Sequence, residues 1–225
     1  MNFLEYADEE LMMMALADRI AGDLEKVLLT HENATLVVPG GTTPGPVFDI
    51  LCGVNMDWSR VRVMLSDERW VPETSDRSNT KLLRERLLVG QASAAQFIPF
   101  FTGDETPEVG LAKVNDTIGA SLPVSVLLLG MGADMHTASL FPHADGLDAA
   151  LDDNAAPVVP IRGGGATEPR VSLSGPVLKS ALQTHVVIKG AEKRTALDNA
   201  PGKLIKAAPI NLVLNDATVH WTGAA

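Results

Sequence analysis

Residues 35–44 read TLVVPGGTTP and join a strand to a helix. The first four are apolar or β-branched, which is typical of a strand buried on both faces of a sheet. Pro44 suits the first turn of the helix that we predict over Pro44–Leu51, because its fixed φ is helical and its missing N–H has no partner there in any case. A strand, a glycine turn and a helix in this order are the repeating unit of an α/β protein.

The same alternation of strand and helix continues along the chain. A helix is predicted from Leu11 to Leu28, where apolar residues recur every three or four positions. Further helices are predicted at residues 79–88, 107–120 and 191–198, and further strands at residues 61–65, 125–129, 171–173, 185–189 and 211–214. The predicted fold class is therefore α/β, with a doubly wound, Rossmann-like and mostly parallel sheet that carries helices on both faces.

The composition suits one compact domain over residues 1–225, because 46% of the residues are hydrophobic and no low-complexity tract divides the chain. The single cysteine, Cys52, has no partner for an internal disulfide, and the acidic N-terminus lacks the basic region of a signal peptide. No apolar stretch approaches the roughly 20 residues of a membrane span. We expect a cytoplasmic protein with no membrane partner, present as a monomer or a weak homodimer.

The formal net charge of −10 argues against a nucleic-acid partner, since binding to a phosphate backbone needs a basic surface. The same charge does not exclude an anionic small molecule as the ligand. A few cations in a cleft act at short range, whereas the diffuse surface charge is screened over about 8 Å at physiological salt.

Three loops that follow predicted strands hold most of the candidate site residues. In an open parallel sheet the ligand crevice lies beyond the carboxyl ends of the strands. We therefore expect convergence of the loops at residues 39–44, 66–72 and 130–142.

The first of these loops is a candidate phosphate site. Gly40 and Gly41 allow close approach of the backbone, and Thr42 and Thr43 add hydroxyls at a helix start, where free amides attract an anion. The alternative is a plain strand-to-helix turn capped by Thr43. The loop is not a P-loop, because the Gly-Lys-Ser/Thr ending is missing.

The loop at residues 130–142, GMGADMHTASLFP, places Asp134 two positions before His136. In an extended segment these side chains point to the same side and can serve as an orienting carboxylate and a general base. The alternative is a histidine that satisfies a loop carbonyl. Met135 replaces the third glycine of a dinucleotide fingerprint, and adding His143 gives no familiar zinc spacing, so neither nicotinamide nor zinc is favoured.

Cations come from three further positions. Asp67-Glu68-Arg69 forms either an ion-pair network that closes the crevice or a site in which Arg69 faces substrate oxygens. Arg170 enters a predicted strand, and Lys193 lies near a predicted helix start. Near a glycine-threonine loop, these two side chains are candidate phosphate clamps.

Together these motifs resemble those of the 6-phosphogluconolactonases, within the broader glucosamine-6-phosphate isomerase/6-phosphogluconolactonase group. The resemblance spans nearly the whole chain. It rests on PGGTTP at 39–44, DWS at 57–59, SDERWVP at 66–72, SN at 78–79, the loop at 130–142, RVSL at 170–173 and GAEK at 190–193.

The resemblance implies a fold of the glucosamine-6-phosphate isomerase type and an enzyme that hydrolyses 6-phospho-D-glucono-1,5-lactone in the oxidative pentose phosphate pathway. The partner is then a small sugar-phosphate lactone, and no metal or organic cofactor is required. By position, His136 is implied as the general base with Asp134 beside it, and Arg69 as a lactone or phosphate contact. Asp67 is either catalytic or structural. The implied phosphate contacts are Gly41, Thr42, Arg170 and Lys193.

Two departures from relatives affect this site. Relatives commonly have glycine at the position of Met135, and a β-carbon removes the easy access to positive φ that glycine allows. Relatives also tend to have a proline-rich stretch before Arg170, where this chain reads ATEP at residues 166–169. Gly163-Gly164-Gly165 precedes that stretch and is predicted to be a mobile loop.

Two alternatives differ in activity. The sister enzymes, which act as isomerases and deaminases on glucosamine 6-phosphate, carry an Asn-Glu-Pro type segment after the histidine. This chain reads SLFP at residues 139–142, which favours the lactonase. The other alternative is a non-catalytic sugar-phosphate-binding protein, similar to the sensor domains of transcriptional regulators. Those carry a basic DNA-binding module, whereas an acidic helix dominates the residues before Thr35.

Overall fold

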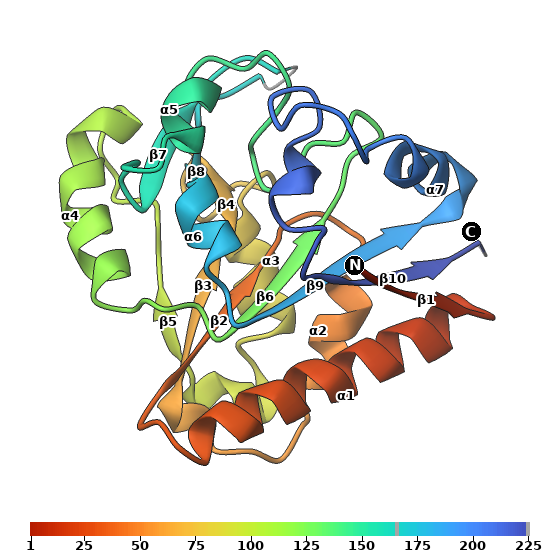
Figure 1. Ribbon diagram of the computed structural model, residues 1–225. Helices are drawn as coiled ribbons and strands as arrows, with labels where there is room; N and C mark the ends of the chain where they lie inside the picture. The colour runs from red at the N-terminus through yellow and green to blue at the C-terminus, as the bar shows by residue number, and fades with distance from the viewer. Residues whose placement is uncertain (165–166, 224–225) are drawn as a thin grey trace.

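The computed structural model describes residues 1–164 and 167–223, and its centre is a seven-stranded sheet (Figure 1). Every strand is parallel to its neighbours. In spatial order the strands are β1 (Asn2–Tyr6), β10 (Thr218–Thr222), β9 (Gln183–Lys189), β6 (Val126–Gly130), β2 (Ala34–Val38), β3 (Val61–Leu65) and β5 (Gln96–Ile98).

Helices cover both faces of this sheet, as Figure 1 shows. One face carries α1 (Glu9–Leu28), α2 (Gly45–Leu51) and α3 (Asn79–Arg86), and the other carries α4 (Pro107–Gly119), α5 (Leu147–Leu151), α6 (Gly175–Lys179) and α7 (Gly190–Asp198). Successive strand residues point to opposite faces, so Leu127 and Leu129 join the core under α4, whereas Val126 and Leu128 join the core under α1. The predicted doubly wound α/β architecture is confirmed.

A second sheet lies beside the first and is antiparallel. Its strands are β4 (Asp67–Arg69), β8 (Arg170–Leu173) and β7 (Val158–Ile161), in that order. The strand predicted at residues 171–173 exists, but it belongs to this small sheet and not to the parallel one. Burial on a strand does not reveal its partner, because pairing depends on residues far away in the sequence. The pairing sets Arg69 opposite Arg170, which brings two cations to one place.

The prediction of a strand at residues 211–214 is wrong, since a 3-10 helix covers Pro209–Leu212. Proline opens this helix, and the Asn211 amide donates to the backbone carbonyls of Ala200 and Lys203. The chain also begins with a strand, β1, which was not predicted. A short apolar run carries too little periodicity to separate a strand from a helical turn.

The predicted helices are all present, with ends shifted by one or two residues. Helix α1 begins at Glu9 because the carboxylate of Asp8 accepts a hydrogen bond from the N–H of Leu11 at 2.8 Å. Of the helices that the structure describes, none combines the length and apolar composition of a membrane span. The predicted mobile loop lies partly outside the described residues, at Gly165, and so does Ala166 of the stretch before Arg170.

Two buried histidines form a directed chain of hydrogen bonds at the β1 edge of the sheet. The Asp23 carboxylate can only accept, so His185 Nε2 donates to it at 3.1 Å. His185 Nδ1 then accepts from His220 Nε2 at 3.1 Å, and His220 Nδ1 accepts from the Tyr6 hydroxyl at 2.8 Å. Both imidazoles are neutral in this arrangement. Burial lowers the pKa of both, that of His220 to about 3, and the nearby Arg19 lowers them further, while Asp23 acts in the opposite direction on His185.

This chain predicts that the protein loses stability as the pH falls below the ordinary histidine pKa of about 6.5. The unfolded chain binds protons there and the folded chain does not, so the free energy of unfolding falls by up to about 1.4 kcal/mol per pH unit for each histidine. Urea unfolding at pH 7.5, 6.0 and 5.0 measures this slope. The variant His220→Gln should show a flatter slope, whereas replacing the exposed His31 by alanine should leave it unchanged. Equal stability of the wild type at pH 7.5 and pH 5.0 would contradict the assignment.

Candidate active site

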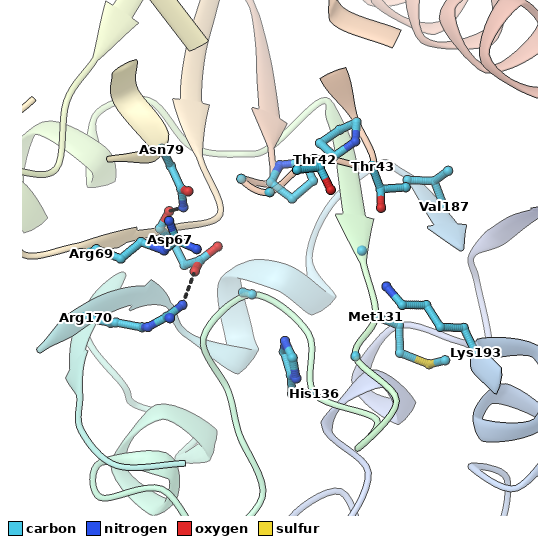
Figure 2. A pocket seen from close by; sticks show the side chains of 17 residues that line it. Thr42, Thr43, Asp67, Arg69, Asn79, Met131, His136, Arg170, Val187 and Lys193 are labelled. Carbon is cyan, nitrogen blue, oxygen red and sulfur yellow. Dashed lines mark hydrogen bonds and ion pairs between the residues drawn. The ribbon is translucent and has the colours of Figure 1, made fainter. Parts of the chain in front are cut away.

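A pocket of about 290 Å³ opens at the carboxyl ends of the parallel strands (Figure 2). After β2 the chain continues to β3 and β5 on one side, and it then returns to β6 on the other side of β2. The strand order reverses at this point, which is where open α/β sheets bind their ligands. The pocket is lined by Pro39, Gly40, Gly41, Thr42, Thr43, Pro44, Asp67, Arg69, Asn79, Gly130, Met131, Gly132, His136, Ala138, Arg170, Val187 and Lys193.

The glycine-threonine loop forms one wall of the pocket. Gly40, Gly41, Thr42 and Thr43 all line it, as predicted for an anion site at the start of α2. Gly40 is required by a close approach, because a β-carbon there would lie 1.9 Å from the Asn79 amide oxygen. A larger residue at position 40 would therefore displace the side chain of Asn79.

His136 is held by Asp134 through its ring and its backbone. Asp134 Oδ1 accepts from His136 Nδ1 at 2.5 Å and from the His136 N–H at 3.2 Å. A carboxylate accepts only, so Nδ1 carries the ring hydrogen, and the lone pair of Nε2 is left for another group. The side chain of His136 is 29% exposed and points into the pocket, while Asp134 does not line the pocket.

The two residues meet for a different reason from the one predicted. The segment is not extended but turns back on itself, since Met135 donates to the Gly132 carbonyl and Gly132 donates to the His136 carbonyl. Met135 has φ 68°, so the left-handed conformation is present without glycine. The Ile210 N–H donates to the Met135 carbonyl at 3.1 Å and fastens the turn to the helix at 209–212.

Arg69 and Arg170 enter the pocket from adjacent strands of the small sheet. Arg170 Nη1 lies 3.9 Å from Asp67 Oδ2, and its guanidinium stacks 5.3 Å from the ring centre of Phe141. Arg69 Nη1 donates to the Arg77 carbonyl at 2.6 Å. The Nε atoms of both arginines are buried, and no hydrogen-bond partner is found for them within residues 1–164 and 167–223. Burial lowers the pKa of Arg170, and Asp67 acts against that shift.

The loop at residues 66–72 combines the two roles that were considered for it. Asp67 forms the ion pair with Arg170, and Arg69 faces the pocket. Glu68 has a third role, because its buried carboxylate accepts from the backbone N–H groups of Asn79 and Thr80 and stabilises the start of α3. Burial nevertheless raises the pKa of Glu68.

Lys193 completes the set of cations on the far side of the pocket from Arg170 (Figure 2). It lies in the first turn of α7, directly after β9. Burial lowers the pKa of its ammonium group, and Lys189 lowers it further, while Glu192 and Asp134 act in the opposite direction. The pocket thus unites three cationic side chains from separate parts of the chain with one imidazole.

The zinc site considered for Asp134, His136 and His143 is not formed. Across the part of the chain that the structure describes, no three His, Cys, Asp or Glu side chains lie close enough to share a metal ion. His143 is also absent from the lining of the pocket.

Comparison with known proteins identifies the family of this chain. A family model described as glucosamine-6-phosphate isomerases/6-phosphogluconolactonase matches residues 7–221. The chain belongs to this family. The resemblance seen in the motifs is confirmed.

Relatives within the family cover almost the whole chain. A 6-phosphogluconolactonase of Mesorhizobium japonicum is 38% identical over 221 residues, which are 96% of this chain and 91% of the relative. A 6-phosphogluconolactonase of Pseudomonas aeruginosa is 36% identical over 220 residues, covering 92% of this chain and 88% of the relative. The crystal structure of a 6-phosphogluconolactonase from Shewanella baltica superimposes with a TM-score of 0.93 at 32% identity, covering 100% of this chain and 97% of that one.

Gly132 offers a direct test of the histidine turn in this family member. A β-carbon at Gly132 would lie 2.2 Å from His136 Nδ1 and 2.4 Å from Asp134 Oδ1, so Gly132→Ala must displace these side chains. We expect turnover to fall by about tenfold to a hundredfold, because small displacements of a reacting group are costly. Gly119→Ala is the matched control, since its β-carbon meets no atom within 4 Å. Full activity of Gly132→Ala would show that the pair does not position the imidazole.

Several pocket residues were not singled out as functional from the sequence. Asn79 donates from its side-chain amide to the Asp67 carbonyl at 2.9 Å and lines the pocket. The only sequence signal for Asn79 was its place in the Ser78-Asn79 motif of the family resemblance. Met131, Ala138 and Val187 also line the pocket, but nothing in their residue types distinguishes them from core residues.

Proposed function

We propose that this protein hydrolyses 6-phospho-D-glucono-1,5-lactone to 6-phospho-D-gluconate, the second step of the oxidative pentose phosphate pathway. One observation carries the proposal. A carboxylate-oriented imidazole with a free Nε2 shares a pocket with three cationic side chains and a glycine-threonine loop. Such a pocket can anchor a phosphate at one end of a molecule and activate water at the other.

The phosphate end is assigned to the loop and the cations. The backbone at Gly40 and Gly41 and the hydroxyls of Thr42 and Thr43 lie at the start of α2, where amides and the helix dipole favour an anion. Across the pocket, Arg170 and Lys193 supply charge-assisted hydrogen bonds to phosphate oxygens. The substrate class that these groups recognise is a phosphorylated small molecule, which agrees with the names of the relatives.

The chemical step is assigned to His136. Its Nε2 takes a proton from a water molecule as the water oxygen forms a bond to the lactone carbonyl carbon. The negative charge on the former carbonyl oxygen is stabilised by Arg69 and by nearby backbone amides. The bond between that carbon and the ring oxygen then breaks, and the imidazolium returns its proton to the departing oxygen. Asp134 stabilises the imidazolium through the 2.5 Å contact with Nδ1.

The sister isomerase and deaminase activity is not favoured. Residues 139–142, SLFP, carry no carboxylate that could assist ring opening of an amino sugar. The aromatic ring of Phe141 lies in that segment, with its centroid 4.4 Å from that of His136. The imidazole therefore borders an apolar group there.

Initial rates on freshly prepared 6-phosphogluconolactone, corrected for its spontaneous opening in buffer, test the proposal. We expect acceleration by the protein that is proportional to its concentration. Glucosamine 6-phosphate serves as the comparison substrate, and neither fructose 6-phosphate nor ammonia should form from it. Binding of 6-phosphogluconate without any acceleration would favour the non-catalytic sugar-phosphate-binding protein instead.

The cellular location, the oligomeric state and the domain organisation are part of the same proposal. We place it in the cytoplasm, as a monomer or a weak homodimer with residues 1–225 forming one domain. A unique Cys52, which cannot form an internal disulfide, and a net charge of −10 support this setting. Sedimentation velocity at several protein concentrations measures the oligomeric state.

A further inference from the structure

Ser139 joins the loop of His136 to both strands that carry the arginines. Its side chain is fully buried, and its hydroxyl donates to Asp67 Oδ2 at 2.5 Å. Its backbone N–H donates to the hydroxyl of Ser172 at 3.3 Å. Asp67 lies on β4 and Ser172 on β8, so one residue fastens the histidine loop to the two neighbouring strands of the small sheet.

Both oxygens of Asp67 are occupied by hydroxyl groups. Ser66 donates to Oδ1 at 2.9 Å, and Ser139 donates to Oδ2. The side chain of Asp67 is 8% exposed, so the carboxylate depends on these donors. A carboxylate whose two oxygens both accept hydrogen bonds is held in one orientation.

Oδ2 is also the oxygen that faces Arg170. The distance of 3.9 Å to Nη1 is an ion pair without a hydrogen bond, and Nε of the same guanidinium is buried with no partner in the described residues. The Ser139 hydroxyl takes one of the two lone pairs of Oδ2 and so competes with the guanidinium for this oxygen. Figure 2 shows Asp67 and Arg170 side by side at the rim of the pocket, so donors that Asp67 does not bind remain available to a ligand.

We infer that Ser139 is a positioning residue of this enzyme, which holds Asp67 as a counter-ion so that Arg170 keeps its hydrogen-bond donors for the substrate phosphate. The inference rests on the proposed function. It assigns Asp67 to the orientation of Arg170 and not to proton transfer. Without the Ser139 hydroxyl, the buried Oδ2 is expected to accept a hydrogen bond from Arg170, whose Nη1 lies 3.9 Å away.

The test is the kinetics of Ser139→Ala on two substrates. For 6-phosphogluconolactone, KM should rise about tenfold, the size of one lost hydrogen bond to a charged group, while kcat stays within about threefold. On unphosphorylated gluconolactone the variant should equal the wild type. The nearly isosteric Ser139→Cys, whose thiol is a weak donor, should change KM in the same direction and guards against a simple packing defect.

A matched control and a double variant sharpen this test. Ser125 is another buried serine, at the opposite end of β6, and its hydroxyl accepts from the Thr35 N–H at 3.0 Å. Ser125→Ala should therefore leave KM and kcat unchanged for both substrates. KM of the double variant Asp67→Asn/Ser139→Ala should exceed KM of Asp67→Asn alone by less than about threefold, because the carboxylate charge that Ser139 orients is already gone. Thermal unfolding of each variant shows whether it is folded.

The outcomes separate this inference from the proposed function. An inactive wild type would overturn the function, and binding of 6-phosphogluconate by calorimetry would still report whether Ser139→Ala weakens phosphate recognition. A fall in kcat at unchanged KM, or equal losses on both substrates, would overturn the positioning role while leaving the lactonase intact. Additive effects of Ser139→Ala and Asp67→Asn would do the same.

Discussion

Replacing His136 by alanine is expected to lower the turnover of 6-phosphogluconolactone by about 10²-fold or more, since general-base contributions typically have that size. The imidazole is the only group in the described lining of the pocket that combines a free ring lone pair with an orienting carboxylate. His136→Gln keeps hydrogen-bonding capacity without a basic nitrogen, so it should lose activity to a similar extent. Stopped assays corrected for spontaneous lactone opening measure both variants.

The control for this experiment is His31→Ala. His31 is exposed and precedes β2, whereas the pocket lies beyond the other end of that strand, so its loss should leave turnover unchanged. Binding of 6-phosphogluconate should survive in His136→Ala, because the cations remain. A His136→Ala enzyme with the turnover of the wild type would remove the imidazole from the mechanism.

Removing a phosphate-binding cation is expected to raise KM selectively for the phosphorylated substrate. For Lys193→Ala and Arg170→Ala we expect an increase of about tenfold to a hundredfold, the range for one lost hydrogen bond between charged groups. The side chain of Arg170 is largely buried and that of Lys193 is half-buried, so solvent screens their charges less than it would on the open surface. Steady-state kinetics on 6-phosphogluconolactone and on unphosphorylated gluconolactone provide the comparison.

Lys179→Ala is the matched control for this pair of variants. Lys179 lies in the last turn of α6, is exposed and does not line the pocket. Its removal should not change KM for either substrate. Equal losses on the two lactones in Lys193→Ala would contradict a phosphate clamp and would place the lysine at the lactone ring.

Four of the seven parallel strands could be predicted because their signals are local, whereas β1, β5 and β10 were missed. In β2, β3, β6 and β9 every strand is a short apolar run followed by a glycine or polar loop, and a helical period comes next. Side-chain period and turn residues depend on immediate neighbours. The α/β class and the edge of the sheet that holds the loops therefore followed from sequence.

The small antiparallel sheet could not be predicted in the same way. Its pairing of β4 with β8 joins Asp67 to Ser172, which are separated by more than a hundred residues. The missed β1 pairs with β10 at the other end of the chain, and the helix at 209–212 was mistaken for a strand. For the two strand pairings the deciding partner is remote, and a single sequence does not name it, whereas the helix at 209–212 depends on Pro209 and on contacts of Asn211 within about ten residues.

The amino-acid sequence by itself determined which kinds of side chain the site contains. Only the tertiary structure decided how those side chains are arranged. A glycine-threonine loop, an Asp-x-His segment and scattered cations indicated an anion site with a base. Their contacts depend on tertiary packing. The histidine meets Asp134 because the segment turns at Met135, and Ser139 reaches Asp67 because the histidine loop packs against β4. Hydrogen bonds act over about 3 Å, so sequence can supply the donors and acceptors while the packing of distant elements selects which of them meet.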